Sequence, residues 1–145
     1  MTPEPILSPL LRRLLACWQE RRRDRIGPAR RDIDPVDLRW ILADLAIVDV
    51  VDDPPRFRFR LVGSNIEHRR DFRWQGNWLD ELPAPELRAR LTETYGAVVR
   101  ARAPRHGFRD IVIEDQTLRS EYLVLPLSTD GDRVDALLVA ARFPD

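Results

Sequence analysis

The order of strand-like patterns along the chain constrains the fold most. Two such patterns, at 45–51 and 57–61, come early, and three more, at 107–114, 118–128 and 133–143, lie near the end. The residues between the two groups have helical or irregular character. A parallel sheet needs strands and helices that alternate one by one, so this order instead predicts an α+β domain with a five-stranded, mostly antiparallel sheet.

The first two strand patterns differ in how apolar residues are spaced. Residues 45–51 are almost continuously apolar, as in a strand that is buried on both faces. Residues 57–61 alternate between apolar residues and arginine, as in a strand with one face in solvent. The aspartates and prolines at 52–55 are turn residues, so we expect the two strands to form a β-hairpin.

Two helix starts precede this hairpin. Ser8 followed by Pro9 is typical of an N-cap and a first helical residue. A helix of about three turns is predicted from there to the arginines at 21–23, with an apolar stripe formed by Leu7, Leu11, Leu14 and Trp18. Asp34 and Pro35 repeat the signature and predict a short helix that ends near Asp44. We therefore divide the chain into an N-terminal amphipathic helix and linker, 1–31, and a domain, 32–145.

The middle of the chain predicts helices that cover one face of the sheet. Short helical segments are expected at 64–69 and 78–82, and Pro85 begins a longer helix that ends before Pro104.

Five stretches carry a resemblance to a known family. They are 31–38, 45–50, 57–64, 75–79 and 122–128, and their order and spacing resemble small stand-alone bacterial proteins of the PAS type over residues 14–143. The resemblance implies a PAS-like sheet with helices on one face and an extra N-terminal helix. It also implies either a small ligand or cofactor bound between sheet and helices, or pairing with other domains.

The cofactors of known PAS domains need residues that this sequence lacks at the required places. A covalent flavin adduct needs a cysteine in the helical middle, but the only cysteine, Cys17, lies on the leading helix. A haem needs an axial ligand there, and the one histidine in that region, His68, lies in a charged turn. His106 is expected in a loop that enters a strand. We therefore expect neither haem, nor a flavin adduct, nor a metal site.

Aromatic residues suggest where a small apolar ligand would bind. The candidates for lining a pocket are Phe57, Phe59, Trp74, Trp78, Tyr95 and Tyr122. The same side chains equally suit a filled core. Arg60 and Arg109 are predicted on strands, where they would meet either an acidic ligand or acids on neighbouring strands.

The apolar stripe of the leading helix has two interpretations. It would pack against the same helix of a second copy and form a homodimer, or it would dock on the open face of its own sheet. The two interpretations are compatible, and the pattern favours neither.

No catalytic constellation is evident, so we expect a sensory or regulatory module rather than an enzyme. Its alternative function is that of an interaction or scaffold domain with a filled core. The 24 basic and 24 acidic residues balance, which argues against nucleic acid and membranes as partners. The N-terminus lacks the pattern of a signal peptide, so a cytoplasmic protein is expected. No kinase or DNA-binding pattern occurs, so a signal would pass to a separate partner protein.

Overall fold

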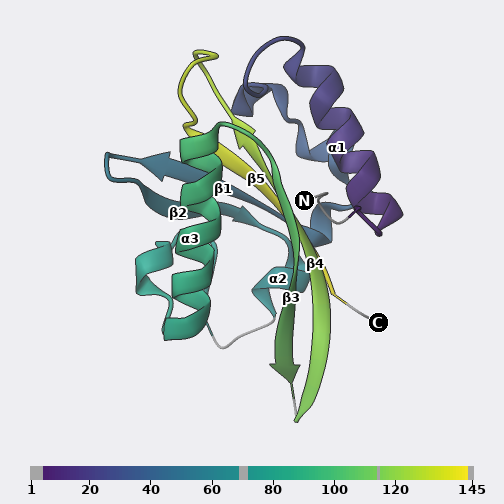
Figure 1. Ribbon diagram of the computed structural model, residues 1–145, viewed down its shortest axis with the longest axis vertical. Coiled ribbons are helices and arrows are strands. Elements are labelled where there is room, and N and C mark those ends of the chain that lie inside the picture. The colour runs from purple at the N-terminus through teal and green to yellow at the C-terminus, as the bar shows by residue number, and fades with distance from the viewer. Residues whose placement is uncertain (1–4, 69–71, 114, 144–145) are drawn as a thin grey trace.

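Five antiparallel strands in one sheet form the centre of the molecule (Figure 1). The computed structural model describes residues 5–68, 72–113 and 115–143. The strand order is β2-β1-β5-β4-β3, which confirms the predicted α+β class and the antiparallel sheet. The strands are β1 (Leu45–Val51), β2 (Arg56–Val62), β3 (Arg105–Ile113), β4 (Gln116–Leu127) and β5 (Ala136–Arg142).

The central position of β1 and β5 follows from their composition. Val48 faces Leu137 and Leu45 faces Ala140 in the register of the two strands, and all four side chains are buried. Strands without a polar face need cover on both sides, which the centre of a sheet provides. In β2 the rings of Phe57 and Phe59 point into the core while the alternating arginines are exposed, as predicted.

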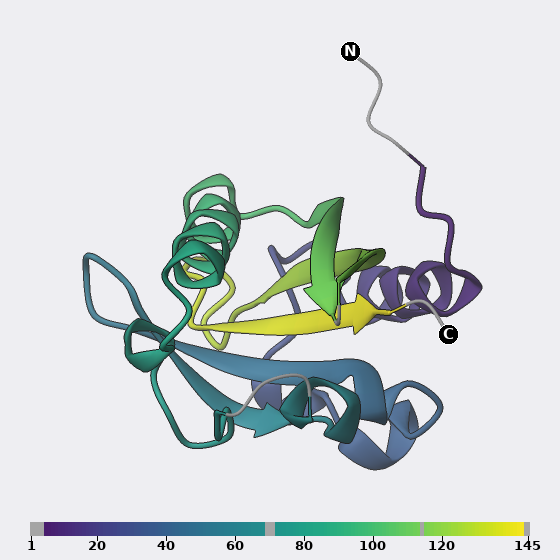
Figure 2. The ribbon, with the colours of Figure 1, turned by 90° about the horizontal axis from the view of Figure 1, so that it is seen from below.

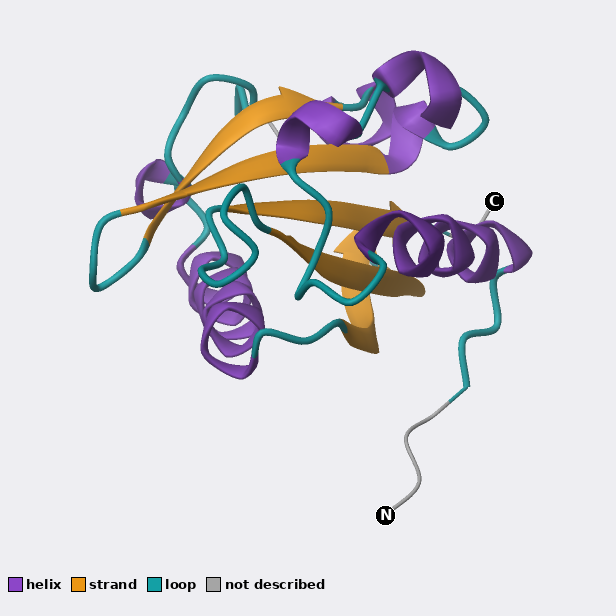
Figure 3. Ribbon diagram, turned by 90° about the horizontal axis from the view of Figure 1, so that it is seen from above, coloured by secondary structure: helices purple, strands orange, loops and turns teal. Residues whose placement is uncertain are grey.

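Helices cover both sides of the strands (Figure 3). One side is covered by α2 (Ser64–Glu67), the 3₁₀ turn η4 (Leu79–Glu81) and α3 (Pro85–Ala101). This confirms the predicted helical middle. These elements bury Leu79, Leu91 and Tyr95 against the same face of the sheet as Phe57 and Phe59.

The leading helix α1 (Pro9–Arg22) covers the other face of the sheet, well apart from α3 (Figure 2). The side-chain oxygen of Ser8 accepts a hydrogen bond from the N–H of Leu11, which confirms the predicted N-cap. Leu11, Leu14 and Trp18 are buried among residues of β1, β4 and β5, and the Trp18 Nε1–H donates to the carbonyl of Pro126 at 2.9 Å. The stripe thus docks on its own sheet, and these three side chains are not available to a second copy.

The linker after α1 also lies against the sheet. A Cβ atom at Gly27 would be only 2.1 Å from the carbonyl oxygen of Pro126, so the backbone approaches β4 where only glycine fits. The N–H of Ser128 donates to the carbonyl of Pro28 at 3.0 Å. A short 3₁₀ turn, η1 (Arg30–Asp32), ends the linker.

The prediction of one helix from Pro35 to Asp44 is wrong. The segment forms two 3₁₀ turns, η2 (Pro35–Leu38) and η3 (Leu42–Asp44). The turns place Leu38 and Ile41 in the core beneath α1. Leu38 and Ile41 are three residues apart, a spacing that suits a 3₁₀ turn. A proline at the first helical position fits an α-helix or a 3₁₀ turn, so packing decides between them.

Docking of α1 on the sheet can be tested by truncating its apolar stripe. We expect Leu14→Ala to lower the free energy of unfolding by about 2–5 kcal/mol because it leaves a cavity in the core. Leu7, which is 60% exposed, is the matched control, and Leu7→Ala should change that free energy by no more than about 0.5 kcal/mol. Urea denaturation measures both, and equal effects of the two substitutions would contradict the docking.

Candidate functional site

Four of the predicted pocket residues meet in the core beneath α3. Phe57 contacts Tyr95 with ring centroids 5.5 Å apart, and Phe59 contacts Trp74 at 5.2 Å, both edge to face. The four side chains are at most 5% exposed. Rings that pack against one another in this way fill the space between sheet and helices. The arrangement favours the filled core, one of the two alternatives that the sequence leaves open.

The other two predicted pocket residues lie outside this aromatic cluster. Trp78 is half-buried beside the edge strand β2, with the Arg56 guanidinium 4.0 Å from its ring centroid. Tyr122 lies on β4 opposite Gly107 of β3. A Cβ atom at Gly107 would be 2.6 Å from the Tyr122 hydroxyl oxygen, so the phenol ring lies over the glycine.

Tyr122 lines a groove between α3 and the β3–β4 hairpin, which we call the hairpin groove. It is open to solvent and has a volume of about 860 Å³. Leu87, Ala89, Arg90 and Thr94 of α3 form one wall, and Arg105, Arg109 and Tyr122 of the hairpin form the other. The groove therefore combines an apolar surface with three guanidinium groups and with the carboxylates of Glu86, Glu93 and Asp110.

The two strand arginines that the sequence singled out have different surroundings. Arg60 forms an ion pair with Asp49 of the neighbouring strand, with 2.7 Å between Nε and Oδ2. This is the cross-strand pairing that the sequence analysis gave as an alternative to ligand binding. Arg109 instead points into the hairpin groove, and its guanidinium carbon is 4.9 Å from the ring centroid of Tyr122.

Charges in the hairpin groove are unevenly paired. Arg105 forms an ion pair with Glu93 at 2.9 Å, and this contact raises the pKa of Arg105. Burial lowers the pKa of Arg109; Tyr95 and Tyr122 oppose this shift, and the positive charges of Arg90 and Arg105 add to it. Burial likewise raises the pKa of the Tyr95 hydroxyl beneath the groove. The groove thus holds a partly desolvated cation, Arg109, whose neighbours include both arginines and carboxylates.

A second polar cluster joins the hairpin to α1 on the opposite face of the sheet. The carboxylate of Glu121 accepts hydrogen bonds from the N–H groups of Leu7 and Ser8, both at 2.8 Å. His106 Nε2 lies 2.7 Å from the same carboxylate. Burial alone raises the pKa of Glu121, but these hydrogen bonds outweigh it and lower the pKa overall. Glu121 thereby fastens the first turn of α1 to β4.

Neither the role of Glu121 nor the position of its partner His106 is predicted from the sequence. His106 was expected in a loop, but it lies within β3 and faces β4. The contact of Glu121 with Leu7 joins residues 114 positions apart, and no local pattern indicates such a pairing.

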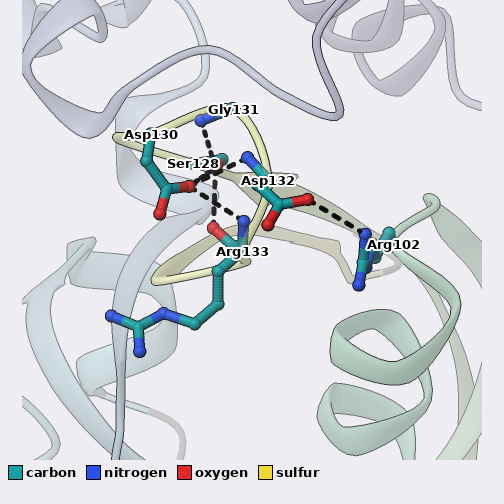
Figure 4. Close-up of polar contacts among 6 residues, drawn as sticks. All are labelled: Arg102, Ser128, Asp130, Gly131, Asp132 and Arg133. Carbon is teal, nitrogen blue, oxygen red and sulfur yellow. Dashed lines mark hydrogen bonds and ion pairs between the residues drawn. The ribbon is translucent and has the colours of Figure 1, made fainter.

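The polar residues between β4 and β5 form a turn that satisfies its own hydrogen bonds (Figure 4). The Ser128 hydroxyl donates to the carbonyl of Arg133 at 2.6 Å. The Asp130 carboxylate accepts from the N–H groups of Asp132 and Arg133 at 2.8 and 2.9 Å, which lowers the pKa of Asp130. Gly131 has the positive φ, 82°, that such a turn needs. These contacts give the cluster a structural role.

Metal-ligating side chains are scattered in the described part of the chain. His68 is exposed at the end of α2, and Cys17 is half-buried on α1. Among the described residues, no three His, Cys, Asp or Glu side chains are placed to hold one metal ion. None of the helices in the same part of the chain is long and apolar enough to cross a membrane.

Comparison with known proteins agrees with this architecture. The family model for the PAS domain matches residues 7–140. A crystal structure of a sensory box sensor histidine kinase from Vibrio cholerae is 18% identical, with a TM-score of 0.52 over 76% of this chain and 91% of that chain. The PAS domain of Bordetella pertussis BvgS is 16% identical, with a TM-score of 0.53 over 78% of this chain and 88% of that chain. No curated protein sequence matches the chain.

The attachment of α1 by Glu121 predicts a pH-dependent stability. We expect Glu121→Gln to lower the free energy of unfolding by about 1–3 kcal/mol at neutral pH because hydrogen bonds to a charged carboxylate are lost. A carboxyl group with a lowered pKa stabilises the fold above its ordinary pKa of 4.5, and this contribution is lost as the pH falls through the lowered value. The difference between wild type and variant should therefore shrink in acid.

Urea denaturation from neutral to acidic pH measures this difference. Glu20→Gln, at an exposed position of α1, is the control for loss of a carboxylate elsewhere on the helix. A difference between Glu121→Gln and wild type that stays constant well below pH 4.5 would contradict the assignment.

Proposed function

The chain belongs to the PAS domain family of sensory and regulatory modules, and we propose that it senses by binding a small ligand in the hairpin groove. The observation that carries the proposal is the contrast between the groove and the neighbouring core. The groove is open, with a volume of about 860 Å³, whereas the aromatic residues between sheet and helices contact one another. A volume of roughly 300–1,000 Å³ is typical of small-molecule sites.

The lining of the groove suits a ligand with an apolar body and a polar end. Leu87, Ala89 and Tyr122 supply apolar surface, while Thr94 and Arg109 supply polar groups. The sequence favours a small apolar ligand because it places six aromatic residues at the pocket, with an acidic ligand at Arg60 or Arg109 as an alternative. Because Tyr122 and Arg109 both line the groove, a ligand with an apolar part and a polar part fits it better than an apolar one.

The geometry of β4 allows a ligand in the groove to affect the docking of α1. Neighbouring residues in a strand point to opposite faces, so Tyr122 faces the groove while Glu121 holds the first turn of α1. Ligand binding that shifts β4 would change the hydrogen bonds of Glu121 and with them the docking of α1. We propose that this helix passes the signal to a separate partner protein in the cytoplasm, without a catalytic step.

The filled aromatic core supports a second candidate function, that of an interaction domain without a ligand. Phe59 contacts both Trp74 and Tyr95, so a ligand between sheet and helices would have to displace packed rings. In this alternative the hairpin groove is a surface for a partner protein. The binding experiment below separates the two functions.

Blocking the groove should abolish ligand binding. A metabolite panel is screened by thermal shift, and binders are mapped by backbone amide chemical shifts. We expect shifts concentrated at 86–94 and 105–110, and a loss of affinity of roughly tenfold or more in Ala89→Trp, whose indole would fill the groove. Ala101→Trp, at the exposed end of α3, is the control and should bind as wild type does. Absence of any binder, or shifts on another face, would contradict the proposal and favour the interaction domain.

Homodimerisation through α1 remains a prediction of the sequence. Because Leu11, Leu14 and Trp18 are buried, Leu7 is the member of the stripe that a second copy can reach while α1 stays docked. If a dimer forms in this way, Leu7→Glu should convert it to a monomer in sedimentation velocity. A dimer that persists in Leu7→Glu would place the interface elsewhere.

A further inference from the structure

Arg109 differs from Arg56, Arg60 and Arg105 in having no carboxylate partner among the described residues. Arg56, Arg60 and Arg105 form ion pairs with Asp80, Asp49 and Glu93, respectively. Arg109 forms no ion pair with the residues that the structure describes, although it is only half-exposed and its neighbours include several acids. Its side chain contacts the Tyr122 ring. An arginine in these surroundings is an unused binding group for an anion.

The stacking on Tyr122 leaves the hydrogen-bonding capacity of Arg109 free. A cation–π contact is an attraction between the positive charge and the ring, so it occupies none of the five N–H donors, which point outward in the plane of the guanidinium group. Contact with the ring also restricts the Arg109 side chain, which reduces the entropy lost when a second group binds to it. Tyr122 therefore prepares the donors of Arg109 for a planar partner.

The electrostatic surroundings favour an anion beside Arg109. Burial weakens the screening of its charge by water, and the exposed Arg90 and the paired Arg105 add smaller positive contributions. Of the acids that line the groove, Glu93 is already paired with Arg105, and Glu86 and Asp110 are exposed. Exposed charges are screened by solvent and salt. The half-buried end of the groove is thus the part where a negative group is most stabilised.

The shape of the donor set favours a carboxylate over a phosphate. Phosphate sites usually gather several donors, often the free N–H groups at the start of a helix. The first turn of α3 instead holds Pro85, which lacks an N–H, and the acidic Glu86. A single guanidinium fork satisfies both oxygens of a carboxylate, whereas it would leave the further oxygens of a phosphate without a partner from that fork.

We propose that the ligand of the hairpin groove is a small organic carboxylate. Its carboxylate group accepts two hydrogen bonds from Arg109, and its apolar body packs on Tyr122 and Leu87. This inference rests on the proposed function, because it names the chemical class of ligand for the same groove.

The test compares carboxylic acids with their uncharged amides. Hexanoate and phenylacetate are titrated beside hexanamide and phenylacetamide, with binding followed by backbone amide and arginine Nε–Hε chemical shifts. The wild type should bind the acids roughly tenfold or more tightly than the amides. Arg109→Gln should remove this difference, and Arg109→Lys should restore part of it because the charge remains while the fork is lost.

Arg39→Gln is the matched control for the loss of one positive charge. Arg39 is exposed, follows η2 beneath the other face of the sheet, and does not line the groove. Its substitution should leave the preference for acids unchanged. The spectra of Arg109→Gln also report whether the fold is intact. If it is not, the preference for acids over amides is compared with wild type in Arg109→Lys and in Arg90→Gln, which lies at an exposed position of α3.

The outcomes separate this inference from the proposed function. Equal binding of acids and amides, or tighter binding of phenyl phosphate than of phenylacetate, overturns the carboxylate class while the groove remains a ligand site. A preference for acids that persists in Arg109→Gln places the carboxylate elsewhere and also overturns the inference. If neither these probes nor any member of the metabolite panel binds in the groove, both proposals fail together.

Discussion

Burial of both faces of β1 and β5 is the constraint on which the other elements depend. Leu45, Val48, Leu137 and Ala140 leave these strands without a polar side, so the sheet is stable only if both of its faces are covered. The middle helices cover one face and α1 covers the other. The leading helix is therefore part of the core, which explains why three of the four residues in its stripe are buried.

The same constraint determines where a ligand has room. Above β1 and β2 the space beneath the helices is taken by aromatic rings, which pack edge to face around Phe59. The β3–β4 hairpin extends beyond the rest of the sheet (Figure 1), so α3 covers it only in part. Gly107 has no side chain, so the ring of Tyr122 can lie over the backbone of β3 at this position. An open groove results at the edge of the sheet, next to a core in which Phe59, Trp74 and Tyr95 pack on one another.

The sequence predicts the parts of this arrangement that depend on local periodicity. All five strands, α1 with its N-cap and α3 follow from alternation, helical spacing and turn residues. The helix at 34–44 failed because packing of Leu38 and Ile41 selects 3₁₀ turns. The site is predicted less well, because the sequence alone does not distinguish an aromatic residue of the core, such as Trp74, from one that lines a groove, such as Tyr122. The position of Tyr122 depends on the register of β3 and β4, which places it opposite Gly107. Pairings such as Glu121 with Leu7 are equally invisible to local patterns.

The register of the hairpin also relates the groove to α1 in a way that neither cluster suggests alone. Gly107 and His106 are neighbours in β3, as are Tyr122 and Glu121 in β4, and each pair supplies one residue to each face. The groove and the attachment of α1 therefore share the same two peptide segments. A displacement of β4 toward or away from α3 moves Glu121 relative to the N–H groups of Leu7 and Ser8, whose hydrogen bonds are sensitive to small changes in distance. In the proposed function, β3 and β4 would therefore link a ligand in the groove directly to α1, without a separate pathway through the core.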